Sequence, residues 1–95
     1  MIYRYAILAA LAFSGRAQAS DPVLKAAPGG AETLATCSSC HSTAYIIMNS
    51  VFLSADDWRA EVSKMRRVFG ASIDDHTADE ISAYLGQYYG VSATR

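Results

Sequence analysis

Along residues 54–70 the apolar positions recur with the period of an α-helix. The recurring residues, at i, i+4, i+7 and i+11, are Trp58, Val62, Met65 and Phe69. Ser54 and Asp57 form the pattern of a capping box, in which a hydroxyl and a carboxylate each satisfy a backbone N–H of the first turn. Gly70 stands where a helix commonly ends. This stretch is therefore predicted to be a helix with one apolar face.

A second helix is predicted between Thr77 and Tyr89. Thr77 and Glu80 repeat the capping-box spacing, and Gly90 follows as the stop. The apolar face of this helix carries Ile81, Tyr84, Leu85 and Tyr88.

The first half of the chain has a weaker pattern. Residues 20–30 hold both prolines, and we expect them to form an extended leader. Ala31–Cys40 is predicted to be a short helix. The residues near one face of this helix are Ala31, Leu34 and Ala35. Residues 41–53 have no clean helical period, although the run Tyr45–Met48 should lie against apolar groups. Strand alternation is absent, so the sequence predicts an all-α fold of three or so helices.

Residues 1–19 have the three parts of a secretory signal peptide. Arg4 lies in a short charged segment, Tyr5–Phe13 is apolar, and Ala17–Ala19 is a small-residue cleavage pattern. The apolar run is far below the roughly 20 residues that a membrane span needs. We therefore expect cleavage after about Ala19, export to the periplasm, and no membrane span in the mature chain.

Length and charge narrow the possible functions. The chain has 95 residues, enough for one small domain, here expected over residues 31–95. Cleavage would remove Arg4 and Arg16 and leave six basic residues against nine acidic ones. No basic stripe with interleaved aromatic residues is present, so we expect no nucleic-acid partner. A domain this small commonly needs a disulfide, metal or cofactor to be stable.

The sequence Cys37-Ser38-Ser39-Cys40-His41 has the C-x-x-C-H spacing of a covalent haem attachment site. Two thiols three residues apart on a helical turn can each bond one vinyl group of the same porphyrin edge. The next residue, His41, can then reach the iron as the proximal ligand. We therefore expect one c-type haem, bound through Cys37 and Cys40.

Two other readings of the cysteine pair are weaker. A local disulfide or a thioredoxin-like redox pair belongs beside a strand, and the pattern predicts no strand. A zinc site would need a further ligand, for which only His76 or an acidic residue is available.

The distal iron ligand has three candidates among the mature residues. Met65 lies on the apolar helical face and is preferred, although a methionine in such a stripe is often core packing. Met48 and His76 are the alternatives, and an open distal site is the fourth possibility. A thioether ligand would raise the reduction potential relative to a second imidazole. Trp58 is expected to pack in the core rather than bind a haem propionate, and Arg66 and Arg67 to lie on a solvated face.

Several segments together resemble class I cytochromes c, and more narrowly the cytochrome subunit of bacterial sulfite dehydrogenases. The segments are CSSCHSTAYI (37–46), WRAEVSKM (58–65), Phe69-Gly70-Ala71 and Tyr84-Leu85. This resemblance implies that the first and last helices cross beside the haem and that Met65 is the distal ligand. It also implies a molybdenum subunit that oxidises sulfite and passes single electrons to the haem.

The sequence departs from the family pattern at two places. Thr33 stands where an aromatic residue is usual, so the helix crossing is expected to depend on Leu34 and the tyrosines. No proline follows Pro28, so a carbonyl within 42–53 is expected to accept the hydrogen bond of the proximal imidazole.

The expected function is that of a periplasmic one-electron carrier, not an enzyme by itself. Its partners would be redox proteins: the sulfite-oxidising subunit that the resemblance implies as donor, and a downstream cytochrome or oxidase as acceptor. The alternatives are a generic periplasmic cytochrome c, a haem sensor with an open distal site, and a haem peroxidase, for which no distal base and arginine are identified.

Overall fold

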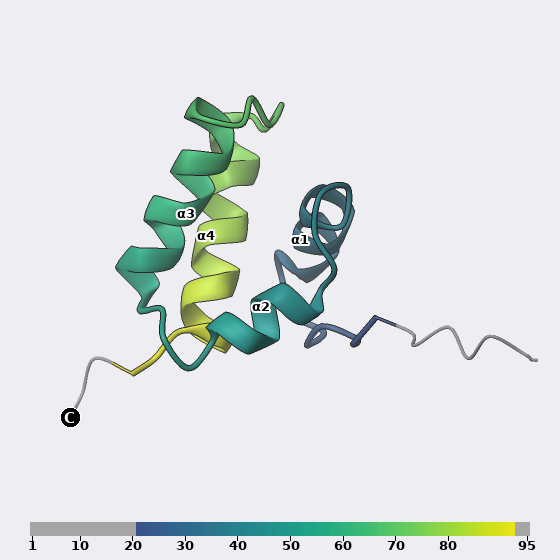
Figure 1. Cartoon of the computed structure of the whole chain (residues 1–95), viewed down its shortest axis with the longest axis vertical. Helices are drawn as coiled ribbons and strands as arrows, with labels where there is room; N and C mark the ends of the chain where they lie inside the picture. Colours follow the sequence, from purple (N-terminus) through teal and green to yellow (C-terminus); the bar gives the residue numbers. More distant parts are fainter. Residues whose placement is uncertain (1–20, 93–95) are drawn as a thin grey trace, which may run out of the picture.

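The computed structural model describes residues 21–92, which form four α-helices and no strand (Figure 1). The helices are α1 (Gly30–Cys37), α2 (Ala44–Asn49), α3 (Ala55–Arg67) and α4 (Asp75–Tyr89). The prediction of an all-α fold is thus confirmed over this range. No helix in 21–92 has the length and apolar character to cross a membrane. The signal peptide expected at residues 1–19 lies outside the described residues.

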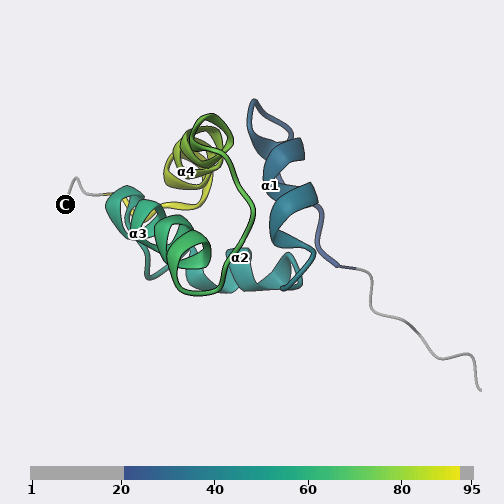
Figure 2. The same ribbon diagram turned by 90° about the horizontal axis from the view of Figure 1, so that it is seen from above.

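Helix α4 is the element on which the other three helices pack. It contacts α3 most extensively, and α1 and α2 more locally, whereas the backbones of α1 and α2 do not come close to that of α3. Viewed end-on in Figure 2, α1 and α3 lie apart, and α4 and α2 complete a ring of helices. The buried apolar core is drawn from α2, α3 and α4, and comprises Ile46, Trp58, Val62, Ala78, Ile81, Tyr84, Leu85 and Tyr89.

Helix α3 begins as predicted and ends earlier than predicted. The Ser54 hydroxyl accepts from the Asp57 N–H at 3.2 Å, and the Asp57 carboxylate accepts from the Ser54 N–H at 2.9 Å, so the capping box is confirmed. The helix stops at Arg67, and Gly70 has a φ of 71° in the turn that follows. Phe69 lies beyond the last turn and is 68% exposed, so it does not belong to the apolar face.

Helix α4 begins two residues before the predicted Thr77. Asp74 is its N-cap, and its carboxylate accepts from the Thr77 N–H at 3.1 Å. The prediction of a capping box at Thr77 and Glu80 was therefore wrong. Asp74, three residues before Thr77, supplies the acceptor, so Thr77 lies within the first turn of the helix. Gly90 follows the last helical residue, as predicted. On the apolar face Tyr89 is buried, whereas Tyr88 is only half-buried.

The short helix α2 was not predicted. Its six residues lie within a segment whose run of apolar side chains has no clear period. Ile46 alone is buried, as expected for part of this run, but Met48 is 70% exposed. Only one residue per turn faces the core in so short a helix, so the pattern is too sparse to recognise.

The crossing of α1 and α4 depends on small residues, which corrects the expectation that Leu34 would support it. Leu34 is 48% exposed, whereas Gly30 and Thr33 are buried. A Cβ atom added to Gly29 would lie 2.9 Å from the Tyr84 Cβ and 2.8 Å from the Glu80 carbonyl oxygen. The two helices approach so closely that a leucine cannot lie between them.

Residues 21–29 lead into α1 and are fixed by hydrogen bonds from the tyrosines of α4. The Tyr84 hydroxyl donates to the Lys25 carbonyl at 2.6 Å, and the Lys25 N–H donates to the Tyr89 hydroxyl at 2.8 Å. Burial, together with the neighbouring Tyr89, raises the pKa of Tyr84 to about 12, so the hydroxyl keeps its proton at neutral pH. The leader ends in a turn at 27–29, one residue earlier than expected, because Gly30 is already helical.

The two glycines with positive φ allow the α1–α4 contact to be tested. Gly29→Ala should lose about 1–2 kcal/mol for the left-handed backbone and about 1–3 kcal/mol more for overpacking against α4. Gly70→Ala is the control, because Gly70 also has a positive φ, of 71°, and no atom lies within 4 Å of the added Cβ. Urea unfolding of both variants measures the difference, and equal losses would show that the contact is not close.

Candidate functional site

The cysteine–histidine motif lies at the C-terminal end of α1. Cys37 is the last helical residue, and the next three residues form a turn in which the His41 N–H donates to the Cys37 carbonyl at 3.0 Å. The predicted helix Ala31–Cys40 is therefore three residues too long at this end. The turn keeps both thiols and the imidazole within one short segment, as the motif requires.

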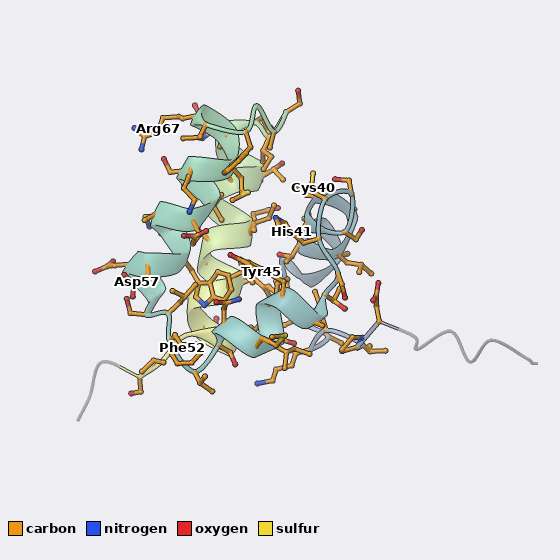
Figure 3. All side chains as sticks on the ribbon, in the orientation of Figure 1. Cys40, His41, Tyr45, Phe52, Asp57 and Arg67 are labelled. Carbon is orange, nitrogen blue, oxygen red and sulfur yellow. The ribbon has the colours of Figure 1, made fainter. Side chains whose placement is uncertain are left out.

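Hydrogen bonds to the leader hold the segment that follows His41. The Thr43 hydroxyl is buried and donates to the Pro22 carbonyl at 2.6 Å, and the Ser42 hydroxyl donates to an Asp21 carboxylate oxygen at 2.7 Å. His41 extends from its turn toward the α3 and α4 side of the molecule (Figure 3). Its ring stacks on Tyr45, with 4.7 Å between the ring centroids.

A small cavity of about 50 Å³ lies beside His41 and is bordered by all four helices. Its lining residues are Cys37, His41, Tyr45, Ile46, Trp58, Glu61, Val62, Met65 and Leu85. Cys37 and His41 come from the end of α1 and the turn after it, whereas Met65 comes from α3, so the three residues line the cavity from different elements. Three of the four predicted site residues thus border one cavity, and Cys40 lies exposed on the adjoining turn.

The other candidate distal ligands are away from this cavity. Met48 is 70% exposed on α2 and is not among the lining residues. His76 lies in the first turn of α4, and its ring Nε2 is 3.0 Å from a Glu80 carboxylate oxygen. Arg66 pairs with Asp75 at 2.7 Å on the surface, as expected for a solvated face.

Trp58 is part of the core and of the cavity wall. It is 2% exposed, and its indole N–H donates to the Tyr89 carbonyl at 2.8 Å. This bond uses the one donor of the indole, so Trp58 serves packing and joins the start of α3 to the end of α4. That agrees with the expectation from its apolar surroundings.

Glu61 is the lining residue whose position the sequence did not reveal. One of its carboxylate oxygens, Oε1, is 3.2 Å from the Lys64 ammonium, but Oε2 is buried and has no hydrogen-bond partner among residues 21–92. The residue falls three positions after Trp58 and four before Met65. That spacing places the Glu61 carboxylate on the apolar face of the helix. The sequence could therefore have indicated that Glu61 lies near Trp58 and Met65.

The two thiols differ in their surroundings. Burial, and secondarily the neighbouring Cys40, raises the pKa of the Cys37 thiol above its ordinary value of 9.0. Cys40 is exposed to solvent, and both cysteines are free thiols.

Among residues 21–92 no three His, Cys, Asp or Glu side chains are grouped to hold a metal ion. A larger hollow of about 460 Å³ lies between the leader and α1, but its lining contains no histidine, cysteine or methionine. The cavity at His41 is therefore the better candidate site.

The residues of this cavity fit a c-type haem in their chemistry. The Cys37 thiol, the His41 imidazole and the Met65 thioether line this space, and the Cys40 thiol lies on the adjoining turn. The other lining residues are apolar or aromatic except for one carboxylate: Tyr45, Ile46, Trp58, Glu61, Val62 and Leu85. No hydrogen bond of the His41 ring is found within 21–92, so the carbonyl of residues 42–53 that was expected to accept from the imidazole stays a prediction. The cavity of about 50 Å³ is smaller than a porphyrin, and the backbones of α1 and α2 are not in close contact with that of α3.

No protein-family model matches the chain, and no curated protein matches it in sequence. The interpretation of the site therefore depends on the motif and on the geometry of the cavity.

The thiols of the haem-free protein should react at different rates. Iodoacetamide attacks the thiolate, and the raised pKa of Cys37 reduces its thiolate fraction at any given pH. Cys40 should be alkylated first at pH 7–8, and the rate for Cys37 should rise only at higher pH than for a free cysteine. Peptide mass spectrometry of timed samples measures both rates. Faster labelling of Cys37 would contradict the difference in burial.

Proposed function

We propose that this chain is an exported mono-haem c-type cytochrome that carries single electrons in the periplasm. The observation that supports this most is the cavity that Cys37 and His41 share with Met65. A covalently bound haem supplies an Fe(III)/Fe(II) couple, which accepts and donates one electron at a time. No bond in a substrate needs to be made or broken, so the chain acts as a carrier and not as an enzyme.

Each residue of the site has a distinct part in this proposal. Cys37 and Cys40 bind the cofactor through thioether bonds, and His41 binds the iron on the proximal side. Met65 binds the iron on the distal side and favours the reduced state relative to a second imidazole. Trp58, Val62 and Leu85 exclude water from the cavity, which stabilises a cofactor with a large apolar ring.

The haem and its ligands can be tested by producing the full chain in a bacterium with a haem c maturation system. The expected product is red, carries the mass of one haem, and in its oxidised state has the far-red absorption band of a sulfur–iron bond. Met65→Ala should lose this band and let the reduced protein bind carbon monoxide. Met48→Ala is the control and should keep the band, because Met48 is exposed outside the cavity.

Three outcomes would change the proposal. A colourless product without added mass would refute haem binding. Loss of the band in Met48→Ala alone would make Met48 the ligand. Ready carbon monoxide binding by the unmodified protein would favour a haem sensor with an open distal site.

We further propose that the electron donor is a molybdenum subunit that oxidises sulfite. This part depends on the resemblance of residues 37–46 and 58–65 to the cytochrome subunit of sulfite dehydrogenases. If it is right, the protein purified from its native periplasm should bring a molybdenum protein with it, and sulfite should reduce the haem. Reduction by other periplasmic donors but not by sulfite would leave a generic carrier.

A further inference from the structure

The Glu61 carboxylate has one oxygen in a buried position, where an unpaired oxygen costs free energy. Its Oε2 atom is buried without a partner among residues 21–92, and the residue lines the cavity together with Trp58, Val62 and Met65. A buried acceptor that lacks a partner costs free energy, roughly 1–3 kcal/mol or more when charged. A leucine or glutamine at this position would avoid part of that cost, so the carboxylate calls for a functional explanation.

The neighbouring cation neutralises this carboxylate only in part. The Lys64 ammonium lies 3.2 Å from Oε1, not at the unpaired Oε2, and its side chain is 49% exposed. Ion pairs that reach solvent are weakened by water and salt. The Glu61 side chain itself is only 25% exposed, so its charge acts on the cavity through a medium less polar than water.

A negative charge in this position affects a redox centre in one direction. The oxidised iron carries one more positive charge than the reduced iron, and a nearby carboxylate stabilises the more positive state. One electron enters on reduction and no bond to Glu61 forms or breaks. The carboxylate therefore favours the oxidised state and opposes the effect of a thioether ligand.

We propose that the negative charge of Glu61 lowers the reduction potential of the haem in this cavity. The inference rests on the proposed haem binding and goes beyond it. Glu61 is not an iron ligand in this proposal. Its negative charge lowers the potential, whereas the Met65 thioether raises it, and the two effects partly cancel. Lys64 acts in the opposite direction, because its positive charge offsets part of the charge of Glu61.

The test is a redox titration of the haem-loaded protein at one pH and ionic strength, with chemical mediators and dithionite. Glu61→Gln keeps the size and the hydrogen-bonding oxygen but removes the charge, so the midpoint potential should rise. Asp56→Asn is the matched control, since it removes one carboxylate from an exposed position on the same helix and should shift the potential by less than half as much. Lys64→Gln should shift the potential in the opposite direction, downward.

The far-red sulfur–iron band should persist in all three variants, which separates a charge effect from loss of the distal ligand. Equal shifts in Glu61→Gln and Asp56→Asn, or a fall in potential in Glu61→Gln, would overturn the inference. If Glu61→Gln does not fold, Lys64→Gln decides alone, and an unchanged or raised potential in that variant would refute it. A wild-type protein without haem would instead refute the proposed function, so the two failures are distinguishable.

Discussion

The close contact of α1 with Tyr84 on α4 is the constraint on which the rest of this structure depends. The tyrosine is 1% exposed, its ring and Cβ lie against Gly30 and Gly29, and its hydroxyl binds the Lys25 carbonyl. Helix α1 makes no comparable contact with any other helix in 21–92. The contact therefore sets the direction of α1, and with it the place where its C-terminal end presents Cys37 and His41.

The opposite wall of the cavity is fixed by different interactions. Helix α3 is held along α4 by Trp58 and Val62, and by the bond from the Trp58 indole to the Tyr89 carbonyl. Met65 is one turn beyond Val62 and so faces the same side. Helix α4 thus holds both walls without filling the space between them. Such an arrangement suits a small domain that obtains part of its core from a cofactor.

The charges around the cavity are unequally distributed. The cavity itself contains one carboxylate, Glu61, and the cation that pairs with it lies toward solvent. The other ion pairs on α3 and α4, such as Arg59 with Asp79 at 3.5 Å, are exposed and contribute little to stability. Glu61 is thus the one charged residue that borders the proposed redox centre within residues 21–92.

The sequence by itself determined the elements that depend on local interactions. The capping box of Ser54 and Asp57, the helical period of Trp58 and Val62, and the stop at Gly90 are decided by neighbours within one or two turns, and the structure has them as predicted. The spacing of the C-x-x-C-H motif is also a local property of the sequence, and the haem that it indicates stays a prediction.

Only the tertiary structure decided which faces meet. Thr33 is buried and Leu34 is not, because the space between α1 and α4 admits nothing larger than a glycine or a threonine. Phe69 is exposed because α3 ends before it, and Glu61 is only partly exposed because its side chain borders the cavity beside His41. These features depend on distances between segments far apart in the chain. A periodic pattern records which side of a helix is apolar, but not how near its neighbour lies.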